Sequence, residues 1–385
     1  MQDGKEKIIL HVVSDTLFFD SISERFDALD GYKNIYLFRA PKIEMHDIKR
    51  IRQKEKLIYT KSEKEWGRYF ALPEVNIVFF HGLFYDAYKS YKYISEDKKV
   101  IWWTYGKDLY EANKYVSPLL DLKLYKKVTG RCFPCFKRKL LTDLSRVYGV
   151  LRGNIPRKRW IKRVDYCSTV FPIEYVLLKQ LRYFRAEPFM LRGVRGFGEY
   201  KPVVKEQAGD IIVGHSATYT DNHLDVIEKI KHCSLHNRKV IMPINYGYED
   251  FKAILRKYKN IGGAEVIHLE KVLPRKEYFE LVGNCTHAIF GAVRQQAVGN
   301  INGCMKTGVK VFLFKDSMDY KQFKQDGYII YSIEDDLNQE ELDKPLSREE
   351  VYHNWKTFYA ILGFNNAADV QANVQKQFDS LYENE

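Results

Sequence analysis

A polar loop stands between an apolar run and a helical pattern in IIVGHSATYTDNHLDVIEKI, at residues 211–230. Backbone N–H groups at a helix start attract phosphate, because they have no partner within the helix and lie at the positive end of its dipole. We therefore predict a diphosphate site here, where Gly214 allows close approach of the ligand and His215, Ser216 and Asn222 add polar groups. The alternative is that the DNH segment only caps the helix.

Two other loops in the second half of the chain carry polar residues after apolar runs. Their sequences are MPINYGYEDF and FGAVRQQAVGNING. A guanidinium can hold a phosphate through two hydrogen bonds, so an arginine in the second loop suits an anionic substrate. The predicted substrate-binding residues are Asn245 and Tyr246 in the first loop, and Arg294, Gln295, Gln296, Gly299 and Asn300 in the second.

In the first half, FFHGLFYDAY and WWTYGKDLYE place further polar residues after apolar runs. The residues of interest are His81, Gly82, Tyr105 and Asp108. His11 lies within the first apolar run of the chain, and Asp15 follows that run. His81 could instead bond backbone at a strand end, and Asp108 could cap the helix that follows.

The elements that must position these loops are strands that alternate with helical patterns, which is typical of an α/β fold with parallel sheets. The alternation breaks between about residues 176 and 210, so we predict a linker near 190–208 and Rossmann-like domains over 1–190 and 209–345. Ligands of such domains bind at the carboxyl ends of the strands, and we expect all five polar loops to line one cleft. The predicted strands are 8–13, 34–38, 76–80, 100–103, 165–171, 211–214, 239–244, 264–269, 287–291 and 309–314.

Composition agrees with a two-domain protein of 385 residues. No run of about 18 uncharged apolar residues predicts a membrane span, and the N-terminus has no signal-peptide pattern, so we expect a cytoplasmic protein. The six cysteines are scattered, and we expect them to be reduced. The pair in CFPC, at 132–135, has no second CxxC, which argues against a zinc or redox site.

The net charge of +12 is concentrated in one segment, because residues 121–163 hold fourteen Lys or Arg against two Asp. Interleaved aromatic and aliphatic residues suit an anionic membrane surface, although an acidic ligand or a solvated basic face would also explain the charge. No recognisable nucleic-acid module accompanies the segment, so no nucleic-acid partner is expected.

Five blocks, in this order, resemble one family: FFHGLF, WWTYGKDLYE, VGHSATYTDNH, MPINYGY and RQQAVGNINGCMKTGV. They are similar to the TDP-N-acetylfucosamine:lipid II N-acetylfucosaminyltransferases, 4-α-L-fucosyltransferase-like bacterial enzymes of enterobacterial common antigen assembly, over residues 75–335. The sequence departs from the family pattern at Tyr105–Lys107, at His215 in place of asparagine, at Ala297 in place of glycine, and in a longer basic insert.

The resemblance implies a GT-B glycosyltransferase, in which two Rossmann-like domains face each other across a cleft. The C-terminal domain would hold the nucleotide-sugar, the N-terminal domain would hold the acceptor, and helices within 346–385 would pack back on the N-terminal domain. No cofactor or divalent metal is expected, because helix amides and Arg294 would take the diphosphate charge. Asp108 and His81 compete as the catalytic base, with Asp108 ranked first.

The implied reaction moves a deoxyamino sugar or related hexose, from a TDP-sugar in preference, to a polyprenyl-diphosphate-linked saccharide. The alternative is a UDP- or GDP-sugar donor and a capsule, O-antigen or other acceptor. The basic segment 121–163 would contact the anionic cytoplasmic face of the bacterial inner membrane, which makes the enzyme a peripheral membrane protein.

Overall fold

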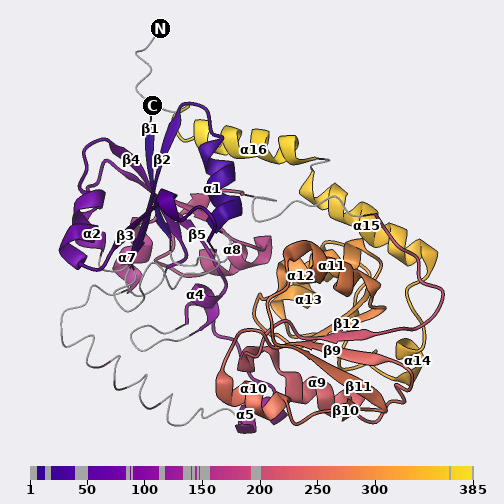
Figure 1. The fold of residues 1–385 in the computed structure, drawn as a ribbon. Coiled ribbons are helices and arrows are strands. Elements are labelled where there is room, and N and C mark those ends of the chain that lie inside the picture. The colour runs from indigo at the N-terminus through magenta and orange to yellow at the C-terminus, as the bar shows by residue number, and fades with distance from the viewer. Residues whose placement is uncertain are drawn as a thin grey trace. The chain divides into compact units, whose positions relative to one another are not determined.

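A computed structural model of the protein describes residues 7–13, 19–39, 51–83, 87, 90–111, 118–132, 140, 144, 147, 157–191, 201–363 and 366–383. The chain divides into two compact units. Unit 1 comprises Met1–Asp121, Lys139–Phe197 and Phe364–Glu385, and unit 2 comprises Leu122–Arg138 and Gly198–Gly363. Each unit contains a seven-stranded sheet with helices, so the predicted α/β class is confirmed (Figure 1).

The sheet of unit 1 is parallel throughout its described pairs, in the order β3-β2-β1-β4-β5-β6-β7. Its strands are β1 (Lys7–Val13), β2 (Tyr32–Arg39), β3 (Leu57–Thr60), β4 (Val75–His81), β5 (Lys99–Trp103), β6 (Tyr166–Ser168) and β7 (Glu187–Pro188). Its helices include α1 (Phe19–Asp27), α2 (Glu63–Phe70), α4 (Lys107–Tyr110), α7 (Arg157–Arg163), α8 (Pro172–Lys179) and α16 (Ala367–Asp379). The central strands are almost entirely apolar, as expected for strands covered on both faces.

Helix α16, from the far end of the chain, completes the core of unit 1. Val370, Val374 and Phe378 recur at a four-residue spacing, which places them on one helix face, and all three are fully buried. The side chain of Gln371 donates to the carbonyl of Arg25 at the end of α1, over 3.0 Å. Figure 1 shows α16 beside α1. The C-terminal helix is therefore an integral part of unit 1.

The sheet of unit 2 has the order β10-β11-β9-β8-β12-β13-β14, and among the described strands only the short β10 runs antiparallel to its neighbour. Its strands are β8 (Ile211–Val213), β9 (Lys239–Pro243), β10 (Asn260–Ile261), β11 (Ala264–Leu269), β12 (His287–Phe290), β13 (Lys310–Leu313) and β14 (Tyr331–Ser332). Its helices include α5 (Lys127–Cys132), α9 (His223–Ile230), α10 (Glu249–Leu255), α11 (Arg275–Asn284), α12 (Val298–Lys306), α13 (Met318–Gln325), α14 (Gln339–Leu342) and α15 (Arg348–Leu362).

Helices α9 and α10 lie on one side of the unit 2 sheet, and α11, α12 and α13 lie on the other (Figure 1). The loops after β8 and β12 therefore lead to opposite faces of the sheet, although these two strands are neighbours. In the described part of the chain, the helices are too short or too polar to span a bilayer.

Candidate functional site

The loops after β8 and β12 meet where the strand order of unit 2 reverses direction. In open α/β sheets, a crevice forms at such a switch point, outside the carboxyl ends of the strands, and ligands bind in it. The loop after β8 runs from Gly214 to Asn222, and the loop after β12 runs from Gly291 to Ala297. The predicted diphosphate loop and the predicted RQQ loop thus lie side by side.

A buried carboxylate, Asp221, joins the side chains of the first loop. Its Oδ2 accepts a hydrogen bond from the Ser216 hydroxyl at 2.7 Å, and its Oδ1 lies 2.9 Å from Nδ1 of His215. Burial opposes ionisation of Asp221, but the charge and hydrogen bonding of His215, with smaller contributions from His223 and Ser216, keep its pKa below the usual value. The group is therefore a buried anion with a histidine partner.

Gln296 ties the second loop to this carboxylate. Its Nε2 donates to Asp221 Oδ1 at 3.0 Å and to the Thr218 hydroxyl at 3.1 Å, and its Oε1 accepts from the Thr220 hydroxyl at 2.9 Å. Asp221, Thr220 and Gln296 are buried, whereas His215 and Thr218 are partly exposed. We call His215, Ser216, Thr218, Thr220, Asp221 and Gln296 the Asp221 network.

Another group packs closely against the backbone of Gly214, as the sequence predicts. That group is a side chain of the protein. Its φ is 68°, and a Cβ added there would lie 2.2 Å from Nε2 of His223. His223 is fully buried, and burial lowers its pKa to about 4, so the ring is neutral. The glycine therefore makes room for a histidine in the first turn of α9.

The side-chain amide of Asn222 is hydrogen-bonded to other groups of the protein. It has a left-handed conformation, with φ 48°, and its Nδ2 donates to the carbonyl of Gly291 at 2.8 Å and to that of Leu124 at 3.1 Å. Its Oδ1 accepts from the backbone N–H of Lys126 at 2.8 Å. Asn222 thus joins both switch-point loops to the segment that leads into α5.

Helix α5 belongs to the basic segment 121–163, yet it packs on unit 2. The carboxylate of Asp225, in α9, accepts hydrogen bonds from the backbone N–H groups of Val128 and Thr129, each at 2.8 Å. Lys126 Nζ pairs with Asp316 at 2.7 Å. The basic segment is therefore divided, with 122–138 in unit 2 and 139–163 in unit 1.

The loop after β9 lies beside the first loop, and it holds Asn245 and Tyr246. The backbone N–H of Ala217 donates to the carbonyl of Tyr246 at 2.8 Å, and the rings of Tyr246 and His215 are 6.0 Å apart. A Cβ at Gly247 would lie 2.2 Å from the carbonyl oxygen of Ala217, so this contact requires a glycine. Tyr246 therefore flanks the Asp221 network.

The start of α12 follows directly from Gln296. Ala297, which stands where the family pattern has glycine, has a φ of 60°, and the N–H of Asn300 bonds its carbonyl at 2.8 Å. Alanine in this left-handed conformation costs about 1 kcal/mol, which glycine would not. Arg294 Nη1 donates to the carbonyl of Gln295 at 2.8 Å. A Cβ at Gly299 would meet no atom within 4 Å, so no packing contact requires this glycine.

In unit 1, His81 at the end of β4 belongs to a chain of buried polar groups. Asn34 Nδ2 donates to the carbonyl of Phe26 at 2.8 Å, which turns Oδ1 toward Nε2 of His11, 2.9 Å away. Burial lowers the pKa of His11 to about 4, despite its hydrogen bond to Asn34, so the ring carries one proton, on Nε2. His11 Nδ1 must then accept from His81 Nε2 over 3.0 Å, which leaves the lone pair of His81 on Nδ1.

Asp108 lies in a different setting, where it links the ends of β4 and β5. Its carboxylate accepts hydrogen bonds from the backbone N–H groups of Leu83 and Tyr105 and from Nε1 of Trp102, each at 2.9 Å, and it is 4% exposed. Gly82, with φ 84°, precedes Leu83, and its N–H bonds the carbonyl of Trp103 at 2.8 Å. His81, Gly82, Tyr105 and Asp108 are thus brought to one edge of the unit 1 sheet.

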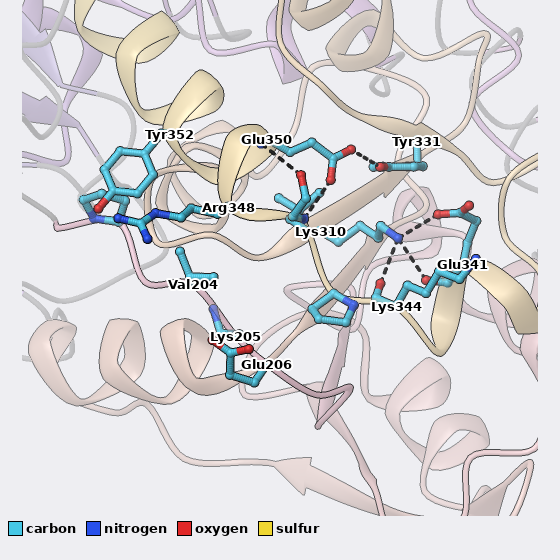
Figure 2. A pocket seen from close by; sticks show the side chains of 14 residues that line it. Val204, Lys205, Glu206, Lys310, Tyr331, Glu341, Lys344, Arg348, Glu350 and Tyr352 are labelled. Carbon is cyan, nitrogen blue, oxygen red and sulfur yellow. Dashed lines mark hydrogen bonds and ion pairs between the residues drawn. The ribbon is translucent and has the colours of Figure 1, made fainter.

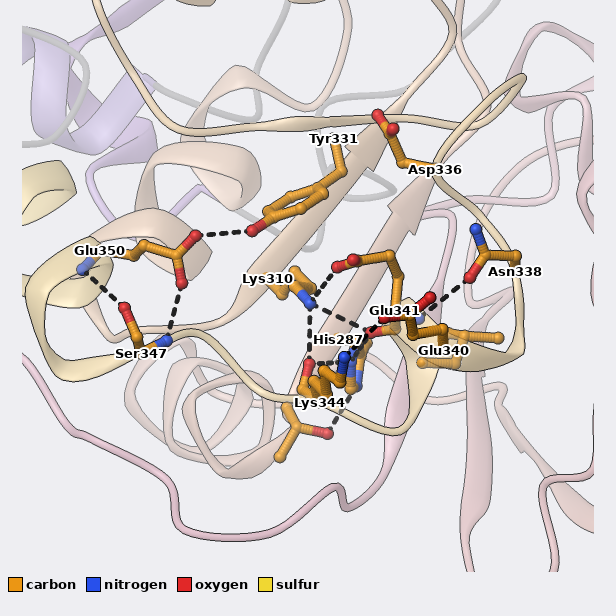
Figure 3. A network of polar contacts seen from close by, with 12 residues as sticks. His287, Lys310, Tyr331, Asp336, Asn338, Glu340, Glu341, Lys344, Ser347 and Glu350 are labelled. Carbon is orange, nitrogen blue, oxygen red and sulfur yellow. Dashed lines mark hydrogen bonds and ion pairs between the residues drawn. The ribbon is translucent and has the colours of Figure 1, made fainter.

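A cavity of about 780 Å³ opens elsewhere in unit 2, near the amino ends of β13 and β14 (Figure 2). It is lined by Lys205, Lys310 and Tyr331, among others, and contains none of the predicted site residues. Lys310 Nζ is held by the Glu341 carboxylate at 2.7 Å and by the carbonyl of Lys344 at 2.8 Å (Figure 3). Lys205 donates to the carbonyls of Thr307 and Gly308. Lys310 therefore stabilises the chain around α14, and Lys205 stabilises the turn between α12 and β13.

Among the residues that the structure describes, no three His, Cys, Asp or Glu side chains converge as metal ligands. Cys132 is exposed, whereas Cys135 and Asp15 lie outside the described residues. The residues that the sequence failed to single out are Asp221, Thr220 and Asn34. An acid inside the otherwise uncharged loop GHSATYTDNH was the available signal for Asp221.

Comparison with solved structures finds the same architecture at low sequence identity. Sucrose-phosphate synthase from Thermosynechococcus elongatus superposes with a TM-score of 0.62 at 9% identity, over 98% of this chain and 100% of that chain. A protein described as trehalose-6-phosphate from E. coli bound with UDP-2-fluoro glucose superposes with a TM-score of 0.54 at 9% identity, over 98% of each chain. At such identities the likeness shows the GT-B fold alone. A sequence search of curated proteins finds no match.

The sequence of unit 2 carries the family signal. A family model described as the 4-alpha-L-fucosyltransferase glycosyl transferase group 56 matches residues 195–365, which include the entire Asp221 network, Arg294 and the start of α12. The predicted GT-B fold and the fucosyltransferase-like resemblance are thus confirmed. The chain is a glycosyltransferase of the GT-B fold, and its residues 195–365 resemble the 4-alpha-L-fucosyltransferase glycosyl transferase group 56.

Proposed function

We propose that this glycosyltransferase transfers a deoxyamino sugar, or a related hexose, from a TDP-sugar to a polyprenyl-diphosphate-linked saccharide. Unit 2 binds the donor, and unit 1 binds the acceptor. The main support for the proposal is that the hydrogen bonds of the Asp221 network join the two switch-point loops to each other, directly before helix α12. The donor diphosphate would lie there, against the first amides of α12.

Arg294, Gln295 and Gln296 would surround the leaving diphosphate, and Asn245 and Tyr246 would contact the sugar or base. Transfer breaks the bond between the anomeric carbon and the diphosphate oxygen, which takes the electron pair. Groups that are already oriented toward that oxygen stabilise the developing charge without reorganisation. The proposal includes no metal ion, since helix amides and Arg294 supply the positive potential.

For the acceptor, we favour His81 over Asp108 as the base. The chain from Asn34 through His11 fixes a tautomer in which His81 Nδ1 can take a proton. Asp108 is committed to three N–H donors, which hold its carboxylate in a structural role at the ends of β4 and β5. Asp108 would then hold the loops that follow β4 and β5, including Gly82 and Tyr105.

A lipid-linked acceptor requires contact with the membrane, and part of the basic segment is suited to it. Leu140, Leu144 and Val147 are helical, 53–60% exposed, and spaced so that they share one helix face. In α7, Trp160 and Ile161 are buried, whereas Lys158, Arg159 and Lys162 are exposed. Apolar side chains beside cations bind anionic membrane surfaces by shallow insertion and charge attraction.

The experiment is a transfer assay with labelled TDP-, UDP- and GDP-sugars and a polyprenyl-diphosphate-linked saccharide in anionic vesicles. We expect transfer from a TDP-sugar that depends on the vesicles. Equal transfer to the same saccharide without its lipid would overturn the lipid-linked acceptor. Selective use of a UDP- or GDP-sugar would overturn the choice of thymine as the base of the donor nucleotide.

Vesicle flotation tests the membrane surface separately. A variant with L140S, L144S and V147S should float less with anionic vesicles, whereas V176S, at an exposed apolar position of α8, is the matched control. Wild-type flotation by the triple variant would contradict the assignment of this face to the membrane.

A further inference from the structure

His215 is the member of the Asp221 network that both carries an ionisable group and is partly exposed. Its Nδ1 lies 2.9 Å from the buried Asp221 carboxylate, and its ring lies beside Tyr246. A role for this side chain in ligand binding rests on the proposed binding of a nucleotide-sugar by unit 2.

The charge of Asp221 requires a positive partner, because an isolated anion inside a protein is strongly destabilised. Its other described hydrogen-bond partners, the side chains of Ser216, Thr218 and Gln296, are neutral. His223 is also close enough to influence Asp221, but burial lowers the pKa of His223 to about 4, so it stays neutral. His215 is the remaining group in the network that can carry the balancing proton.

Nε2 of His215 is not required for the hydrogen bonds within the Asp221 network. Gln296 Nε2 lies 3.4 Å from His215 Nε2, near the limit of a hydrogen bond. Both Gln296 hydrogens have nearer acceptors, in Asp221 at 3.0 Å and Thr218 at 3.1 Å, and its Oε1 is held by Thr220. The N–H at His215 Nε2 can therefore be offered to a ligand.

We propose that His215 is a catalytic residue that donates a charged hydrogen bond from Nε2 to the leaving diphosphate, and that Asp221 is the positioning residue that holds it protonated. When the anomeric C–O bond breaks, its electron pair passes to the diphosphate oxygen, and the acceptor oxygen forms the new bond to carbon. The acceptor proton goes to the base in unit 1. His215 keeps its proton and balances the charge that develops on the diphosphate.

A comparison of nucleoside diphosphates with monophosphates isolates this contact. A group that binds the outer phosphate should affect TDP binding and leave TMP binding unchanged, whereas general damage to the site would weaken both. The experiment is isothermal titration calorimetry of wild type, H215N and D221N. Each protein is titrated with three pairs of nucleotides: TDP with TMP, UDP with UMP, and GDP with GMP. H232N, at an exposed histidine of unit 2, is the matched control.

We expect H215N to reduce the preference for diphosphate over monophosphate by about tenfold to a hundredfold, because a hydrogen bond from a charged group contributes about 1.5–3 kcal/mol. D221N should reduce it in the same direction, and H232N should not change it. H215N decides the outcome if D221N, which alters a buried group, fails to fold.

An unchanged preference in H215N would overturn the inference and leave the proposed function intact. Failure of wild type to bind TDP, UDP or GDP would instead overturn the proposed donor site itself. A parallel loss of TDP and TMP affinity in H215N would assign His215 a structural role and would also overturn the inference.

Discussion

His223 packs against Gly214 so closely that a Cβ on the glycine would lie 2.2 Å from the imidazole Nε2. The ring belongs to the first turn of α9, and the glycine is the first residue after β8. One contact between two residues of the GHSATYTDNH loop therefore sets the path by which the chain passes from strand to helix, and it positions His215 and Ser216 between them.

Replacing Gly214 with alanine should destabilise the protein and disrupt the donor site. The positive φ costs about 1–2 kcal/mol for a residue with a Cβ, and crowding of a buried ring adds about 1–3 kcal/mol. The measurement is denaturant unfolding together with nucleotide titration. For the unfolding measurement alone, G299A is the matched control, because its Cβ meets no atom within 4 Å, and it should leave stability within about 1 kcal/mol of wild type or raise it. Equal stability of G214A and wild type would contradict the contact.

Variants of His81 and Asp108 should separate catalysis from stability. H81Q should lower kcat by a factor of about 10²–10⁴ with a small change in melting temperature, since it removes a base. D108N should lower the free energy of unfolding by about 1–3 kcal/mol, because the new amide hydrogens face backbone N–H donors. The reverse pattern, a stable but inactive D108N and an active H81Q, would make Asp108 the base.

Acid should destabilise the fold through its buried histidines. Burial, with the nearby charges of Arg238 and Lys310, lowers the pKa of His287 to about 3, and burial lowers that of His11 and His223 to about 4. Their pKa in the unfolded chain is near 6.5, so the unfolded state binds more protons as the pH falls below that value, and stability is lost. Each such group contributes a slope of about 1.4 kcal/mol per pH unit.

H287Q should therefore reduce this slope between pH 6 and pH 4.5 by about one proton, or about 1.4 kcal/mol per pH unit. Denaturant unfolding at several pH values measures the slope directly. H232Q, at an exposed histidine, should leave it unchanged. An identical slope in H287Q and wild type would mean that His287 is already protonated in the folded protein.

The ten strands predicted from apolar runs all occur, because buried parallel strands are nearly continuous apolar segments that pattern reasoning detects. Strand β3 was missed because LIYT is short and follows a charged run, and β7, β10 and β14 contain two residues each. No local pattern marks such edge strands, since tertiary contacts create them.

Part of the candidate site could also be predicted from the sequence, and part could not. Strand ends and helix starts located the loops that hold His81, Asp108, His215 and Gln296, because parallel strands place such loops at one edge. The partners inside those loops could not be predicted, since the bond from Gln296 to Asp221 spans 75 positions of the sequence. The sequence also cannot show that the side chain of His223 fills the space beside Gly214, which was predicted to allow close approach of a ligand.

The most direct test of a nucleotide-sugar site in unit 2 is the thermal stabilisation of the protein by TDP, UDP, GDP and their common sugars. A ligand that binds only the folded state raises the apparent stability by mass action, by about 2.7 kcal/mol at a hundred times its Kd. We predict a rise with TDP and TDP-sugars that R294A abolishes. No rise with any of these nucleotides, or a rise that R294A leaves unchanged, would contradict a donor site at the switch point of unit 2.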